Sequence, residues 1–425
     1  MKLKSLIRML GPGLLYAGAA VGVSHLVQST RAGSNFGFDL VLVLIIANIL
    51  RYPFFEFAPR YASATGKSLV DGYNSISKWA LGLFAVLQVS TMFAIQATVT
   101  IVTAGIVGYI FNIPLNTIWV SSIILVVLMI IILFGRYSAL DKIIKYVIVI
   151  LALSTIIAVC FALNLKVEKI PEQLISFDWK NHIHLIFLIS FIGWMPAPLD
   201  ISVWHSLWSV AKTKDLGYKP NLKQSLTDFN IGYIGTAILA LFFLTLGALV
   251  IHGTGEELSE KGVVFAGQFI SMYTKSIGNW SYPLVAAAAL ATMFSTTLTC
   301  LDAYPRVLTP TFKILFPKTK KILIQWEVVW MVILVIGTII ILSILASSMQ
   351  FMVKLATIIS FVTAPILAIL NYKVITQKHV PIEARPKLWL KILAWFGMIF
   401  LSLFSIFYIL WLIFPNYFYV ILQLS

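Results

Sequence analysis

The sequence is poor in charged residues and in cysteine. Only 11% of the 425 residues are Asp, Glu, Lys or Arg, and the chain has 2 cysteines. Soluble domains carry about 25% charged residues, so this composition excludes a water-soluble globule. Two cysteines are too few for a disulfide framework. Cys160 and Cys300 both fall in apolar stretches, where we expect them to pack as small apolar side chains.

Motifs of catalysis are also missing. The chain has no phosphate-binding glycine loop, no nucleophile elbow and no paired-cysteine metal motif. His182 and His184 lie in an expected loop between apolar runs, where a solvated role is the simpler interpretation. We therefore expect neither an enzyme nor a bound cofactor.

Long apolar runs dominate what remains. Hydrophobic side chains make up 60% of the chain. Runs of about 20 apolar residues recur from end to end, and each is long enough to cross a membrane as a helix. The sequence predicts an all-α polytopic membrane protein with about 11 transmembrane helices. The predicted spans are residues 10–30, 37–60, 79–110, 116–135, 140–164, 183–211, 226–251, 281–303, 324–346, 349–371 and 388–413.

The formal net charge of +15 follows from membrane topology. With the N-terminus placed in the cytoplasm, the great majority of the 31 Lys and Arg residues fall in cytoplasmic segments, as the positive-inside rule requires. The basic excess therefore indicates a lipid bilayer, and not nucleic acid, as the partner. We expect an integral protein of the cell (inner) membrane with a cytoplasmic N-terminus. The first residues lack a signal-peptide cleavage pattern, which is typical of mature protein.

Two predicted spans are interrupted by glycine or proline at matching places. The first reads GPGLLYAGAAVGVSHLVQST and the sixth reads FLISFIGWMPAPLDISVWHSLW. Pro196 and Pro198 cannot donate helical hydrogen bonds, so carbonyls of the preceding turn lose their partners and the helix should open. Freed carbonyls can bind a cation, and irregular backbone at membrane depth is typical of transporter sites. The alternative is that these residues only kink their helices.

The two interrupted spans each open a set of five. The sequence thus predicts two five-helix repeats, residues 1–165 and 166–371, and an extra eleventh helix within residues 372–425. Because each repeat has an odd number of spans, the second copy is inverted relative to the first. This arrangement is that of broken-helix secondary transporters.

Ionisable residues within spans are further candidates, because each costs at least a few kcal/mol in lipid unless it faces a cavity, a partner or the interface. Asp302 can pair with Arg306, four residues on. Lys354 can extend to the interface or face a cavity. Solvation is the expected role of the acidic residues near span ends, which are Asp39, Glu56 and Glu327. The remaining candidates are His25, Asp200 and His205.

Several segments resemble those of NRAMP divalent-metal transporters. The opening GPGLLYAGAAVGVSHLVQSTRAGSNFGF resembles the family's first helix, and RYASATGKSLVDGY is similar to its R/K-x-G-x-A-T-G-K-x-L loop after helix two. FSTTLTC in span eight is similar to the family's Q-S-S-T-L-T, and MP in span six to its M-P-H. The resemblance covers most of the chain. It implies a LeuT-like inverted-repeat fold, a divalent metal ion as substrate, and a binding site between helices one and six.

The sequence departs from that family at the first interruption. The family's D-P-G-N aligns with Gly22, Val23, Ser24 and His25, so its metal-binding Asp is absent and His25 stands in place of its Asn. The family's acidic residues in helix three are missing too, since residues 72–140 contain no Asp or Glu. A carboxylate here could neutralise part of a divalent charge and carry a proton. Its loss argues against the family's ordinary proton symport.

The second interruption can be aligned with the family in two ways. Matching M-P directly puts the metal-binding methionine at Met195. Anchoring on the downstream pair His205 and Ser206 instead puts Pro198 at the methionine position and Asp200 at the family's first histidine. The sequence leaves both alignments open.

The predicted metal site combines both interruptions. Asp200 is the one carboxylate beside them, and a dehydrated divalent ion needs an anionic ligand. Imidazole from His25 and a thioether from Met195 would favour Mn²⁺ or Fe²⁺, whereas Asp200, Ser24 and carbonyls would suit Mg²⁺. Gly22 and Pro196 complete this site. Hydrogen bonding between helices is the usual role of uncharged polar residues in spans, but the pathway candidates are Gln96, Thr100, His205, Ser295, Thr296, Asp302 and Lys354.

The sequence therefore predicts a secondary transporter that moves divalent metal cations across the membrane by alternating access. A small organic cation or an amino acid is the alternative cargo, because Gly22 leaves room for a larger ligand and Asp200 could pair with an ammonium group. The residues carry no information on the oligomeric state.

Overall fold

Helices make up all of the regular structure among the described residues. The computed structural model describes residues 11–134, 137–165, 167–318, 325–346 and 348–414. The α-helices are α2 (Pro12–Ala20), α3 (Thr30–Phe36), α4 (Val41–Thr65), α5 (Leu69–Ile76), α6 (Lys78–Ile110), α7 (Thr117–Leu133), α8 (Tyr137–Ala162), α9 (His182–Gly193), α10 (Ile201–Leu216), α11 (Leu222–Val250), α12 (Gly262–Ile277), α13 (Tyr282–Leu315), α14 (Trp326–Leu345), α15 (Met349–Ile375) and α16 (Leu388–Ile413). Short 3₁₀ turns occur at Pro171–Gln173, Asn279–Ser281 and Ile382–Ala384.

The predicted all-α membrane architecture is confirmed. Within the described ranges, 7 helices are long and apolar enough to cross a membrane, namely α4, α6, α11, α13, α14, α15 and α16. Three shorter apolar segments lie in α7, α8 and α9. With the interrupted first segment, α2 to α3, they reproduce the predicted succession of spans. The division into repeats at residues 165 and 371 stays a prediction.

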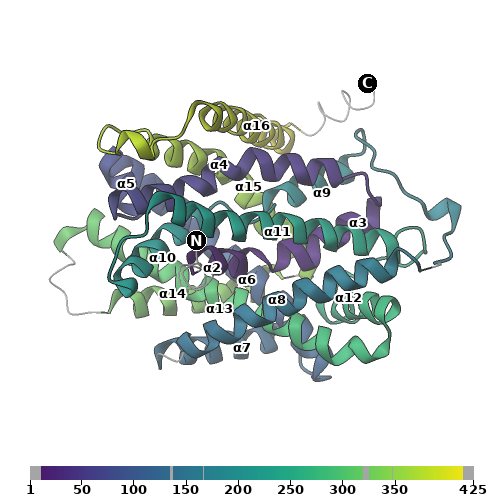
Figure 1. Cartoon of the computed structure of the whole chain (residues 1–425). Coiled ribbons are helices and arrows are strands. Elements are labelled where there is room, and N and C mark those ends of the chain that lie inside the picture. Colours follow the sequence, from purple (N-terminus) through teal and green to yellow (C-terminus); the bar gives the residue numbers. More distant parts are fainter. Residues whose placement is uncertain (1–10, 135–136, 166, 319–324, 347, 415–425) are drawn as a thin grey trace.

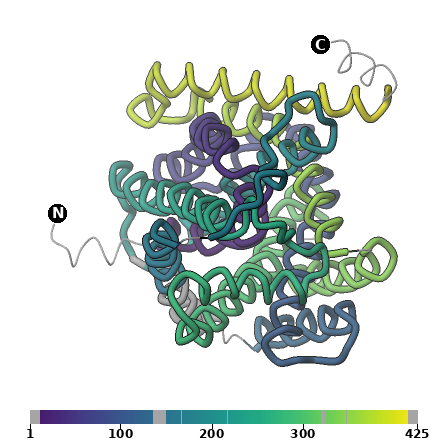
Figure 2. Tube along the Cα trace, turned by 90° about the vertical axis from the view of Figure 1, so that its right-hand side faces the viewer, coloured from purple at the N-terminus to yellow at the C-terminus, as the bar shows by residue number. Residues whose placement is uncertain are grey.

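The long helices α6 and α13 form the middle of the bundle. Both are buried over most of their apolar length, whereas α14 and α16 are buried over only about a third or less of theirs. Both views place α16 at one edge of the bundle and α7 at the opposite edge (Figures 1 and 2). The exposed side chains of α16 are apolar, as expected for a helix that faces lipid.

Both predicted interruptions are present. In the first segment, α2 ends at Ala20, the backbone is irregular around Gly22, and a π-helical turn, Ser24–Ser29, leads into α3. In the sixth, α9 ends at Gly193 and the chain runs without helix until α10 begins at Ile201. The two prolines in this second stretch remove two helical donors, which explains the break. The alternative of simple kinks is therefore wrong.

The segment 252–280, which connects the predicted spans 226–251 and 281–303, contains the helix α12. Its apolar residues Phe265, Phe269 and Tyr273 recur every four residues and are buried on one face. A helix with one apolar face packs against a protein surface and does not span a bilayer. This spacing could have revealed α12, but its short apolar stretch fell below the length that marks a span.

Glycines let α3 and α11 approach until their backbones touch. A Cβ added at Gly33 would lie 1.9 Å from the Leu244 carbonyl oxygen, and one added at Gly247 would lie 2.3 Å from the Thr30 carbonyl oxygen. Small residues at such interfaces permit the tight van der Waals packing that holds membrane helices together. The second half of the first segment is therefore packed tightly against α11.

Replacing Gly247 by Ala should lower the free energy of unfolding by about 1–3 kcal/mol, because the added methyl group has no room. Gly235→Ala, on the same helix, is the matched control, since nothing lies within 4 Å of its new Cβ. Thermal unfolding of the purified proteins in detergent measures both. Equal melting temperatures for the two variants would show that the α3–α11 contact is not as tight as described.

Candidate substrate site

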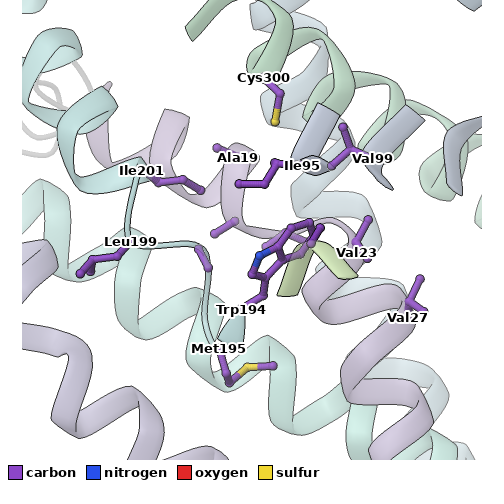
Figure 3. Close-up of a cluster of buried hydrophobic side chains, with 14 of the residues drawn as sticks. Ala19, Val23, Val27, Ile95, Val99, Trp194, Met195, Leu199, Ile201 and Cys300 are labelled. Atoms are coloured by element: carbon purple, nitrogen blue, oxygen red, sulfur yellow. The ribbon is translucent and has the colours of Figure 1, made fainter. Parts of the chain in front are cut away.

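A small buried cavity lies between the two interruptions. Its volume is about 20 Å³, enough for about one water molecule. In Figure 3 the Trp194 indole lies among apolar side chains from both segments and from α6. The cavity is lined by Ala19, Ala20, Val23, Ser24, Ile95, Val99, Trp194, Pro198, Ile201, Trp204, Thr296 and Cys300.

Neutral hydroxyl groups cover the carbonyls freed at the first interruption. Ser24 Oγ donates to the Ala20 carbonyl at 2.7 Å. Thr296 Oγ1, from α13, lies 3.3 Å from the Val21 oxygen and 3.4 Å from the Gly18 oxygen, but also 3.0 Å from Thr292 O in its own helix. A hydroxyl has one hydrogen to donate. These carbonyls are thus only partly satisfied and remain available to a cation.

An arginine covers the carbonyls freed at the second interruption. Arg51 Nη1, from α4, lies 2.8 Å from the Ile192 oxygen, 3.1 Å from the Gly193 oxygen and 3.1 Å from the Met195 oxygen. The Arg51 side chain is fully buried. Its positive charge faces the C-terminal end of α9, where the helix dipole is negative.

The His25 imidazole is directed toward α11. Its Nε2 lies 2.9 Å from the Thr236 carbonyl oxygen, and its Nδ1 lies 2.8 Å from Ser24 Oγ. Because a carbonyl can only accept, Nε2 of the neutral ring carries the hydrogen, and Nδ1 shares the single Ser24 hydroxyl hydrogen with the Ala20 carbonyl. Both ring nitrogens are therefore engaged, and His25 is not among the residues that line the cavity.

The Asp200 carboxylate lies between α10, α6 and α13. It is buried and accepts a hydrogen bond from Thr91 Oγ1 at 3.0 Å. The Tyr304 phenol and the Arg51 guanidinium are close enough to interact with it electrostatically. Asp200 itself does not line the cavity, but Pro198 and Ile201 on either side of it do.

Met195 is buried beside the cavity without lining it. Figure 3 shows its side chain next to the Trp194 ring. Met195 contributes its carbonyl to Arg51, and a cis peptide bond joins it to Pro196. Of the two alignments of this stretch, the one based on His205 puts a cavity residue, Pro198, at the methionine position.

The uncharged pathway candidates mainly connect helices. Gln96 Nε2 donates to Thr100 Oγ1 at 3.3 Å and to the Thr297 carbonyl at 3.2 Å, which joins α6 to α13. Thr100 donates to the Gln96 carbonyl. Ser295 is buried on α13. Thr296 alone of the four reaches the cavity.

The charged and histidine candidates have separate environments. Asp302 pairs with Arg306 at 2.6 Å, as the four-residue spacing predicted. The His205 ring packs against Tyr16 and Phe229. Lys354 is half-buried and lines a second cavity, of about 400 Å³, at the end of the bundle where α12 lies. It thus faces a cavity, one of the two roles left open.

The expectation that Glu56 is solvated is wrong. Glu56 is buried and forms an ion pair with Arg60, whose Nη1 also donates to the Ala384 carbonyl at 3.2 Å. The two residues are four positions apart and therefore adjacent on one face of α4. This neutralisation lets a carboxylate remain inside the bundle without water.

Sequence reasoning missed three residues of the site. Cys300, interpreted as a packing residue, presents its thiol to the cavity. Trp194 fills the space between the interruptions and donates from Nε1 to Ser360 Oγ at 2.7 Å. Arg51 was left unassigned within a span. The signal for Arg51 was its position alone, since an arginine far from a span end must find acceptors.

Most residues that line the cavity are apolar, and its possible side-chain ligands are the hydroxyls of Ser24 and Thr296 and the thiol of Cys300. Among the described residues, no group of three or more His, Cys, Asp or Glu side chains is close enough to hold a metal ion. In the arrangement seen here, the site thus lacks a preformed set of charged ligands.

Gly22→Ala should destabilise the protein by about 1–3 kcal/mol. The added Cβ would lie 2.8 Å from Thr296 Oγ1 and 2.9 Å from its Cγ2. Combining it with Thr296→Ala should recover part of the loss, because the two atoms in conflict are removed. Melting temperatures of the single and double variants form the test, with Gly82→Ala as a control in open space. Strictly additive losses would rule out this contact.

Known proteins are similar to this one over nearly the whole chain. A family described as "Natural resistance-associated macrophage protein-like" (Nramp) matches residues 13–411. Uncharacterized protein PM0681 of Pasteurella multocida is 34% identical over 402 residues, which cover 94% of this chain and 91% of that protein. The divalent metal cation transporter MntH of Lacticaseibacillus casei is 24% identical over 306 residues, covering 69% of this chain and 64% of that one.

Solved structures share the fold. A variant of the Eremococcus coleocola manganese transporter superposes with a TM-score of 0.68 at 17% identity, covering 99% of this chain and 91% of that chain. MhsT in complex with L-phenylalanine gives a TM-score of 0.64 at 16% identity, covering 93% and 98%. The fold is thus that of the LeuT-like transporters, as the resemblance implied. The chain belongs to the Nramp family of membrane transporters.

Proposed function

We propose that this protein is a secondary transporter that moves divalent metal cations through the cavity between its two interrupted helices. The observation that carries the proposal is the incompletely satisfied carbonyls of Gly18 and Val21, which face one shared hydroxyl in the middle of the bundle. A cation is the ligand that such carbonyls bind. The MntH relatives, named divalent metal cation transporters, support the same cargo.

The ligands would come from both interruptions. The Gly18 and Val21 carbonyls, which contact Thr296, and the Ser24 and Thr296 hydroxyls that line the cavity would supply neutral oxygen, and Cys300 would supply sulfur. A divalent ion in a low-dielectric site also needs negative charge. Asp200 lies between Pro198 and Ile201, which line the cavity. A rotation of the short non-helical segment before α10 would therefore bring the Asp200 carboxylate to the ion. The oxygen-rich set suits Mg²⁺ or Mn²⁺, and the sulfur would favour Mn²⁺ or Fe²⁺. His25 and Met195, which do not line the cavity, would pack around the residues that bind the ion.

Contacts at both ends of the first segment support alternating access. At the start of α2, the Asp228 carboxylate of α11 accepts from the backbone N–H of Gly11 at 3.1 Å and of Gly13 at 2.7 Å. At the end of the segment, Arg31 of α3 donates to the carbonyls of Leu258 (2.8 Å) and Ser259, in the loop before α12. We infer that these contacts hold the two ends of the segment closed and that each must open in turn during alternating access. Loss of the family's acids in helix three favours uptake that is not proton-coupled.

A small organic solute is the second candidate cargo. The apolar lining by Trp194, Ile95 and Val99, and the absence of a cluster of metal-ligating side chains in the described ranges, favour it. Isothermal titration calorimetry separates the two. Saturable binding of Mn²⁺ or Mg²⁺ that weakens in Asp200→Ala supports metal transport, whereas binding of an amine or amino acid alone supports the alternative.

In liposomes, the wild-type protein should take up Mn²⁺ or Mg²⁺, and Asp200→Ala should lower the initial rate at least about tenfold. The reason is that the ion loses its one anionic ligand. Asp215→Asn, an exposed carboxylate on the same helix, is the matched control and should transport normally. Wild-type liposomes inert to every divalent ion would disprove the proposal. Normal uptake by Asp200→Ala would exclude that residue as a ligand.

Asp228→Asn should favour opening at the α2 end. The amide keeps the size of the carboxylate but has one acceptor oxygen for two backbone donors. A cysteine introduced at Ser209, which lines a small cavity beside Asp228, should then react several-fold faster with a membrane-impermeant maleimide. Asp215→Asn is again the control. An unchanged labelling rate would show that this contact does not hold the entrance closed.

A further inference from the structure

The two interruptions are satisfied by chemically different groups. At the first, the freed carbonyls face the hydroxyls of Ser24 and Thr296. At the second, they face a guanidinium that is covalently part of the chain. Hydroxyl groups can rotate away and release their carbonyls to an ion. An arginine keeps its positive charge at all times. The carbonyls that contact Arg51 would therefore have a cation beside them throughout the transport cycle.

The surroundings of Arg51 are those of an ion site. One nitrogen, Nη1, contacts three carbonyl oxygens within 3.1 Å, two from the last turn of α9 and one from the irregular stretch. Cζ of the guanidinium lies 5.9 Å from the centre of the Phe55 ring, whose face attracts cations. Nε and Nη2 have no hydrogen-bond partner in the part of the chain that the structure describes. The group is therefore held as a charge, mainly through one nitrogen, and not as a fork that binds an acid.

The charge has a structural purpose. An unpaired arginine inside a span is strongly unfavourable, and so are unpaired carbonyls at the end of a half-helix. Placing the two together offsets both penalties. The Ile192 oxygen also accepts from the Met195 N–H at 3.1 Å, so without the guanidinium the Gly193 and Met195 oxygens, at the negative end of α9, would require another cation.

We propose that Arg51 is a tethered cation that fills the ion-binding position of the second interruption, in the place that a dissociable Na⁺ or K⁺ co-ion would otherwise take. Two consequences follow. The protein needs neither Na⁺ nor K⁺ for stability, and divalent uptake is independent of their gradients. The second consequence rests on the proposed transport function, whereas the first does not.

The test is melting of the full-length protein in detergent, in choline, sodium or potassium chloride at equal ionic strength. Wild type should melt at the same temperature in all three salts. Arg51→Met should melt lower in choline and regain at least half of the loss in Na⁺ or K⁺, because the vacated position then binds the free ion. Arg51→Lys, which keeps a charge, should not respond to the salt.

Arg385→Met is the matched control. Arg385 also donates to backbone carbonyls, those of Lys378 and Val380, but in a loop outside the spans. Its loss should lower the melting temperature without any response to Na⁺ or K⁺. A salt response equal to that of Arg51→Met would mean that the effect is not specific to the interruption and would overturn the proposal.

Uptake into liposomes provides the second measurement, at a fixed membrane potential. Wild-type uptake of Mn²⁺ should be unchanged by an imposed Na⁺ or K⁺ gradient, whereas Arg51→Met should need one of these ions and be stimulated about tenfold by it. Wild-type uptake driven by such a gradient would overturn the tethered-cation proposal even if Arg51→Met did not fold. An Arg51→Met protein that folds and melts identically in all three salts would overturn it too. Wild-type liposomes without divalent uptake would refute only the transport function, since melting is measured without it.

Discussion

Backbone polar groups that lose their helical partners inside a membrane must find others, and the whole centre of this protein is arranged around that requirement. Two helices stop midway, at Ala20 and at Gly193, and leave carbonyl oxygens without helical partners. These oxygens contact side chains of α4 and α13 and the Ser24 hydroxyl of the first interrupted segment. The candidate site therefore lies where the backbone hydrogen bonding of both helices is interrupted, and a substrate bound there would compete with the groups that already contact these carbonyls.

Much of the fold could be predicted from residue patterns, because length and hydropathy decide whether a helix crosses a membrane. Pro196 and Pro198 marked the second interruption by removing donors, and the spacing of Asp302 and Arg306 gave their ion pair. The site was less predictable. The direction of His25 depends on Thr236, 211 residues away, and no local pattern encodes such a contact. α12 escaped notice because amphipathic helices lack the long apolar run that identifies a span.

The asymmetry between the interruptions distinguishes this chain from the family pattern that its sequence resembles. The position aligned with an acidic ligand is Gly22, which packs closely on Thr296, so the expectation that Gly22 leaves room for a larger ligand is wrong in this arrangement. Charge has not disappeared from the centre, however. It resides in Asp200, at the start of α10, and in Arg51, on α4, where the family resemblance gave no reason to look. Conservation of a fold can thus accompany a redistribution of the charges that operate it.

The glycine contacts along α11 have a mechanical consequence. Gly33 is seated on α11 near one end of that helix, and Gly13 near the other, where an added Cβ would lie 2.0 Å from the Asp228 carbonyl oxygen. Both halves of the interrupted helix thus pack against α11, which continues without a break past the interruption. A tilt of α11 moves its two ends in opposite directions. This one rigid helix can therefore couple a movement at one membrane surface to a movement at the other.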